Sequence, residues 1–181
     1  MEAARAAGTA EDSRHRITHV TLVSPSDVPR FAAQGVTADF QMADDSVFPD
    51  RFQKVFGPFL GGARVRQEAL RLRSLYDAGA RVVLSSDYDV GGISPFAGMQ
   101  RALTRGPESL PSLAAAIRAF TIEPAWRMRK EDRTGTLEKG KLADIIVLDR
   151  GLFRIPPSQL GATKVLLTLL EGETVWRAPG F

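Results

Sequence analysis

His19 and Asp87 are the side chains in this sequence whose types and positions could do chemistry together. Each stands near the carboxyl end of a predicted strand, and the carboxyl ends of parallel strands meet on one face of an α/β barrel. A neutral imidazole and a carboxylate both bind Zn²⁺ and similar divalent ions. A water on such an ion would become a hydroxide nucleophile, and the carboxylate could carry its proton to a leaving nitrogen.

Each of the two residues also has a purely structural interpretation. Asp87 could cap the turn into the next helix, since Asp is common in such turns. His19 could be a hydrogen-bonded residue of the core. The pair alone leaves these alternatives open.

The elements that must position the pair are predicted as strand–helix–strand units. Runs of β-branched residues predict strands over residues 15–23, 36–41 and 80–86. Ser24, followed by proline, predicts the start of a helix between the first two strands. So short a connecting unit implies that these strands pair in parallel.

The second connection is longer and is predicted in two parts. Residues 42–63 carry several glycines and prolines and are expected to form a loop. Residues 65–79 are expected to form one helix, because apolar residues recur along one stripe. Four arginines flank that stripe, which suggests a solvated surface more than an anion-binding face.

Beyond Asp87 the pattern changes from helical to antiparallel β. Helices are predicted to start at the serine N-cap Ser94 and over residues 110–120, with a short one from Glu123. A strand over residues 145–148 and a hairpin formed by 164–170 and 174–177 follow.

Composition limits the class of protein. The chain has 181 residues, 44% of them apolar, a formal net charge of +3, two histidines and no cysteine. Disulfides, thiol catalysis and cysteine zinc sites are therefore excluded. Without a dense basic block, a membrane-length apolar run or a signal-peptide core, we expect a cytoplasmic protein with no nucleic-acid or membrane partner.

Three motifs, in order, resemble those of the amidohydrolase superfamily, in the branch called amidohydrolase family 3. They are Arg14-His-Arg-Ile-Thr-His19, then Ser86-Asp87-Tyr-Asp-Val90 followed by Pro95, and Gly135-Thr-Leu-Glu-Lys-Gly-Lys-Leu-Ala-Asp-Ile-Ile-Val-Leu-Asp149. The resemblance implies a metal-dependent hydrolase of non-peptide C–N bonds, built on a TIM-like (β/α)₈ barrel with an appended β-sandwich.

The resemblance also implies roles for individual residues. His19 matches the metal-ligand histidine of the sixth barrel strand. Asp87 matches the aspartate of the eighth strand, which is both a metal ligand and a proton shuttle. Gln41 matches a glutamine near the end of the seventh strand and would line the substrate pocket, whereas His15 would serve structure. Zinc is the divalent metal we expect.

The sequence departs from the family where the other ligands should be. The His-x-His of the first strand, the fourth-strand lysine or carboxylate and the fifth-strand histidine are all absent. We therefore expect residues 1–130 to form a partial barrel of about three βα units, and residues 131–181 the carboxyl-terminal β segment of a composite sandwich.

These departures lead to the expectation of a truncated chain that is inactive alone. Three parallel strands cannot close a barrel, so a companion chain or a second copy is expected to cover the open edges. The site would then act on a small-molecule amide. The alternative is a non-catalytic fragment or interaction module that keeps the βα packing.

Overall fold

A computed structural model describes residues 2–8, 12–42 and 44–181 of the chain, in an α/β arrangement with two separate sheets. The helices are α1 Glu2–Ala7, α2 Val28–Ala33, α3 Pro49–Leu60, α4 Gly62–Glu68, α5 Leu72–Asp77, α6 Pro95–Thr104, α7 Leu113–Phe120 and α8 Ile122–Arg127. The strands are β1 Arg16–Thr18, β2 Thr37–Gln41, β3 Val82–Ser85, β4 Ile145–Leu148, β5 Val165–Leu170 and β6 Glu173–Arg177. Three 3-10 helices complete the set: η1 Asp45–Val47, η2 Leu152–Arg154 and η3 Pro157–Ala162.

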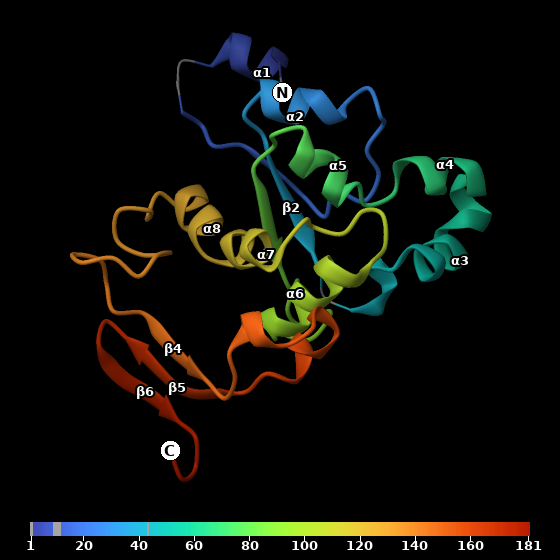
Figure 1. Ribbon diagram of the computed structural model, residues 1–181. Helices are drawn as coiled ribbons and strands as arrows, with labels where there is room; N and C mark the ends of the chain where they lie inside the picture. The colour runs from blue at the N-terminus through green and yellow to red at the C-terminus, as the bar shows by residue number, and fades with distance from the viewer. Residues whose placement is uncertain (1, 9–11, 43) are drawn as a thin grey trace.

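The first sheet is parallel, as the sequence predicts, and its strand order is β1-β2-β3. Its central strand β2 is buried along nearly its whole length. Figure 1 shows β2 in the middle of the molecule, with α7 and α8 on one side and α3 and α4 on the other. The outer strand β1 is exposed at all three of its residues, and among the described residues it pairs with β2 alone.

The second sheet is antiparallel, with strand order β4-β5-β6, and it lies near the carboxyl end of the chain (Figure 1). The predicted strand over residues 145–148 and the hairpin are both confirmed. η3 lies between β4 and β5 in the chain and packs on α6, where the amide of Gly161 donates to Oε1 of Gln100 at 2.8 Å. Leu160 of η3 is buried in the main core.

The N-cap predicted at Ser94 is confirmed, and the structure adds a second serine cap at Ser112. The hydroxyl of Ser94 accepts from the amide of Ala97, and the hydroxyl of Ser112 accepts from the amide of Ala115 at 3.2 Å. These bonds satisfy amides that a helix leaves unpaired in its first turn.

The prediction of a loop over residues 42–63 is wrong, because most of this segment is helical. η1 and α3 fill it, and α4 begins at Gly62. Pro49 occupies the first turn of α3, where its missing N–H is not needed. Phe52 is buried, and its ring lies 4.4 Å from that of Phe56, so burial of this aromatic face outweighs the glycine and proline near the end of the helix.

The single helix predicted over residues 65–79 is also wrong, because the helix is interrupted between α4 and α5. At this interruption, the segment before α2 forms backbone hydrogen bonds with residues at and just after the end of α4. The amide of Val23 donates to the carbonyl of Glu68 at 2.9 Å, and the amide of Leu70 donates to the carbonyl of Thr21 at 3.0 Å. Leu70 adopts a left-handed conformation with φ of 43°.

The first predicted strand and the first predicted cap both need correction. β1 covers only residues 16–18 of the expected 15–23, because the backbone turns out of the sheet at His19. α2 starts at Val28 with Asp27 at the N-cap position, and Ser24 instead precedes a turn in which its carbonyl accepts from the amide of Asp27.

Candidate functional site

His19 directly follows β1 and leaves the sheet in a left-handed conformation. Its φ is 67°, and that of Val20 is 48°. Such angles are uncommon for residues other than glycine and cost of order 1 kcal/mol. The turn lifts His19 out of the strand direction, and its side chain is 55% exposed.

Asp87 stands two residues beyond β3 in a similar conformation, with φ of 51°. Aspartate tolerates this region better than most residues, because its short polar side chain can hydrogen-bond locally. The carbonyl of Asp87 accepts from the amide of Val90 at 2.7 Å, which closes the turn. The carboxylate is 39% exposed.

The two turns bring the side chains together. Nε2 of His19 lies 3.8 Å from Oδ2 of Asp87. Bonds from zinc to histidine nitrogen and to carboxylate oxygen are each about 2.0–2.2 Å. One ion could therefore contact both atoms.

The donor types fit a divalent metal, but the number of donors falls short. Zinc sites use four protein ligands when structural and three when catalytic. Across residues 2–8, 12–42 and 44–181, no group of three or more histidine or acidic side chains could hold a metal ion. The pair supplies at most two ligands.

Gln41 ends β2, the strand between those that lead to His19 and Asp87. It pairs in register with Ser85 of β3. Its side-chain Oε1 is buried and has no hydrogen-bond partner. A buried acceptor without a partner is unusual in a folded protein, which marks Gln41 as the polar side chain at the carboxyl end of the central strand.

His15 lies immediately before β1. Its backbone carbonyl accepts from the amide of Thr37 at 2.8 Å, which continues the β1–β2 pairing by one residue.

Arg14 anchors the chain just before β1. Its guanidinium lies 2.8 Å from Asp12 and 2.8 Å from Glu131, and it covers the Trp126 ring at 4.3 Å. Hydrogen bonds from Arg14 lower the pKa of both carboxyls, while these carboxyls raise the pKa of Arg14. Arg81, just before β3, covers the same ring at 3.7 Å, so both outer strands begin against α8.

Three of the four arginines along α4 and α5 have partners within this segment. Arg64 pairs with Glu68 at 2.9 Å and Arg73 with Asp77 at 2.7 Å, each one helical turn away. Arg71 donates to the carbonyl of Gln67 and to the hydroxyl of Ser74. These contacts support a solvated helix surface more than an anion-binding face.

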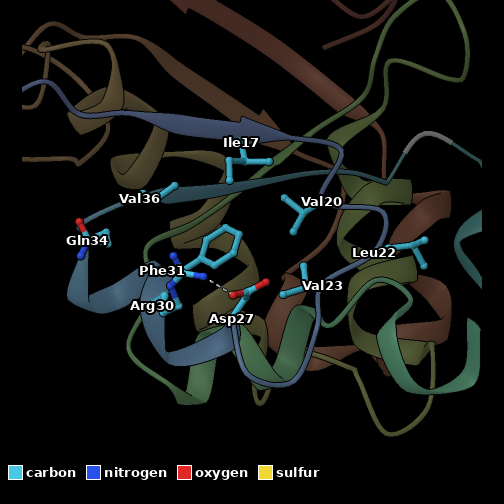
Figure 2. Close-up of a pocket in the computed structure, with 9 residues that line it drawn as sticks. All are labelled: Ile17, Val20, Leu22, Val23, Asp27, Arg30, Phe31, Gln34 and Val36. Carbon is cyan, nitrogen blue, oxygen red and sulfur yellow. Dashed lines mark hydrogen bonds and ion pairs between the residues drawn. The ribbon is translucent and has the colours of Figure 1, made fainter. Parts of the chain in front are cut away.

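A pocket of about 270 Å³ lies beside the exposed strand β1. Figure 2 shows the ring of Phe31 from α2 facing Ile17 of β1, with Val20 and Val36 on either side. Asp27 and Arg30 form an ion pair at its polar rim. The pocket is apolar inside and adjoins the free edge of the sheet.

Sequence reasoning missed one residue near the site, Asp39. Its side chain is 2% exposed in the centre of β2, and it accepts from Arg16 and from Ser85. The signal was present, because an aspartate interrupts a strand that is otherwise buried. Nothing local in the sequence shows which partners it meets.

The sequence matches the amidohydrolase family over residues 1–176. The chain belongs to this family. Its amidohydrolase relatives include the N-substituted formamide deformylase of Arthrobacter pascens, 32% identical over 127 residues, which are 66% of this chain and 23% of the relative. The imidazolonepropionase of Bacillus velezensis is 29% identical over 106 residues, 58% of this chain and 25% of the relative.

Solved structures of metal-dependent hydrolases show the same fold as this amidohydrolase chain. An adenosine deaminase from Xanthomonas campestris with bound zinc superposes with a TM-score of 0.64 at 17% identity, covering 88% of this chain and 36% of the deaminase. The chain thus spans about a quarter of the two curated relatives named above.

None of the described helices combines the length and apolar character that crossing a membrane requires.

Proposed function

We propose that this chain forms part of a metal-dependent hydrolase of C–N bonds, with His19 and Asp87 as metal ligands and zinc as the metal. The observation that carries the proposal is the 3.8 Å approach of Nε2 of His19 to Oδ2 of Asp87, in a chain of the amidohydrolase family. The relatives named as a formamide deformylase and an imidazolonepropionase support the class of bond.

Asp87 has a second role in this proposal. A bound divalent ion supplies an activated water at neutral pH. The Asp87 carboxylate accepts a proton from the water that attacks the amide carbon. It then delivers this proton to the nitrogen as the C–N bond breaks, which yields a carboxylic acid and an amine. Gln41, at the end of β2, would line the substrate pocket.

We further propose that residues 1–130 correspond to three βα units of a TIM-like barrel, and residues 131–181 to part of a sandwich. A companion polypeptide would extend the sheet at β1 and bring the missing ligands next to His19. The exposed strand β1 and the apolar pocket beside it support this arrangement. A parallel strand added there would carry a helix, whose apolar face the pocket could receive.

The alternative function is a non-catalytic interaction module. The interaction module is favoured by the small number of ligands, since the described residues supply only two and both are half-exposed. The two functions make different predictions about metal binding, so one titration separates them.

The deciding experiment is a Co²⁺ titration of the chain, followed through its two histidine rings by NMR. Co²⁺ takes the same nitrogen and oxygen ligands as zinc and broadens nearby resonances. We expect the His19 ring to broaden before the His15 ring, and Asp87→Ala to remove this preference. Asp89→Ala, in the same turn, is the matched control and should keep it. Equal broadening of both rings would favour the interaction module.

A second experiment tests the companion. The chain is co-expressed with the amino-terminal portion of the Arthrobacter pascens deformylase, and zinc-dependent formate release from an N-substituted formamide is measured. We expect release from the mixture, none from the chain alone, and none with Asp87→Ala. A complex that forms without releasing formate, or a homodimer of this chain by sedimentation, would count against the companion.

A further inference from the structure

Asp39 is a carboxylate in a place where the chain otherwise buries apolar groups. It lies in the middle of the central strand β2, between Ala38 and Phe40, which are both fully buried. Its own side chain is 2% exposed. Burying a carboxylate is expensive unless it is paired and hydrogen-bonded.

The partners of Asp39 come from the two neighbouring strands. Nη1 of Arg16 in β1 donates to Oδ2 at 2.9 Å, and the hydroxyl of Ser85 in β3 donates to Oδ1 at 2.8 Å. Both carboxylate oxygens are therefore hydrogen-bonded, Oδ2 to a residue of β1 and Oδ1 to a residue of β3. The strand register places Asp39 opposite Thr18 and Val83, so both partners reach it diagonally.

This arrangement links two strands that share no backbone hydrogen bonds. The sheet order is β1-β2-β3, so β1 and β3 are each bonded only to β2. Arg16 stands three residues before His19, and Ser85 stands two residues before Asp87. The Asp39 carboxylate thus joins, through side chains, the two strands that end in the candidate ligands.

We propose that Asp39 is a positioning residue, which sets the spacing of His19 and Asp87 by holding Arg16 and Ser85 on one carboxylate. An apolar residue such as Val83, its neighbour in β3, would fill the same kind of place without the cost of desolvation. An apolar residue cannot hold polar side chains from both neighbouring strands in one fixed geometry. The proposal rests on the proposed function only in treating His19 and Asp87 as a ligand pair.

The test is a double-mutant cycle without metal, so that its result is independent of whether the chain binds zinc or hydrolyses anything. Replacement of Asp87 by asparagine changes the charge beside His19, and the resulting change in the His19 ring chemical shifts reports their proximity. The same change is measured again in the Asp39→Asn background. We expect it to fall at least about twofold there, because the two strand ends are no longer held together.

Three further variants define what the result means. Val82→Ala destabilises β3 from a buried position without touching the Asp39 contacts, and should leave the Asp87→Asn effect at His19 intact. Arg16→Gln and Ser85→Ala each remove one contact and should give intermediate reductions. These two also decide the question if Asp39→Asn does not fold. An undiminished Asp87→Asn effect in the Asp39, Arg16 and Ser85 variants, or an equal loss in Val82→Ala, would overturn the proposal.

Discussion

Nε2 of His19 lies 3.8 Å from Oδ2 of Asp87, although the strands that lead to these residues are not neighbours. Adjacent strands are about 4.8 Å apart, so β1 and β3 are separated by about 10 Å across β2. Both backbones turn at positive φ as they leave the sheet, and the two side chains span the distance that remains. The candidate site is therefore carried by two residues with strained backbones.

Strain at His19 predicts an unusual response to glycine. Because glycine adopts positive φ freely, His19→Gly should be more stable than His19→Ala by about 1 kcal/mol. His15 is not among the described residues with positive φ, so it is the matched control, and there alanine should be more stable than glycine. Urea unfolding of the four variants measures this. Equal stability of the two His19 variants would show that the turn is not strained.

The aromatic face of α3 predicts a sharp contrast between two phenylalanines in one helix. Phe52 is 4% exposed and Phe59 is 84% exposed. Phe52→Ala should lower the free energy of unfolding by about 3–5 kcal/mol, as expected for a buried ring. Phe59→Ala should leave it within about 0.5 kcal/mol of the parent. Thermal and urea unfolding check both values, and a similar small effect at both positions would contradict the packing of α3.

At Arg105, we expect the protein to tolerate removal of a buried charge. The side chain is 3% exposed, and its Nε and Nη1 have no hydrogen-bond partners. Burial lowers the pKa of Arg105 to about 10. Arg105→Met should therefore be as stable as the parent or about 1 kcal/mol more stable. Arg73→Met, which breaks an exposed pair with Asp77, should cost about 0.5 kcal/mol or less. A loss above about 2 kcal/mol for Arg105→Met would show that the buried charge is stabilising.

The contacts of Asp149 predict that the stability of the antiparallel sheet depends on pH. Its carboxylate accepts from Arg150 and from the amide of Lys164, which together lower the pKa of Asp149 to about 2. Because the folded pKa lies below the unfolded value of about 3.9, this stabilisation is complete above that value and is lost as the pH falls toward 2. Asp149→Asn should thus be less stable than the parent at pH 7, and most of this difference should be lost as the pH falls through about 2. Urea midpoints at several pH values test this, and a constant difference would contradict it.

The sequence alone determined features that depend on neighbouring residues. The serine cap at Ser94 acts within one helical turn, so no distant contact is needed to predict it. The short β-branched runs of β2, β3 and β4 and the hairpin that follows are equally local. The three motifs, around His19, around Asp87 and over residues 135–149, together indicated the family.

Only the tertiary structure decided where local signals compete with distant contacts. Glycine and proline suggested a loop in place of α3, but burial of Phe52 favours the helix. The predicted helix over residues 65–79 is interrupted because Thr21 and Val23 take backbone hydrogen bonds there. The approach of His19 to Asp87 and the three-strand contact of Asp39 join residues from different strands. No sequence spacing specifies such distances, because they arise from sheet register and from the turns that end each strand.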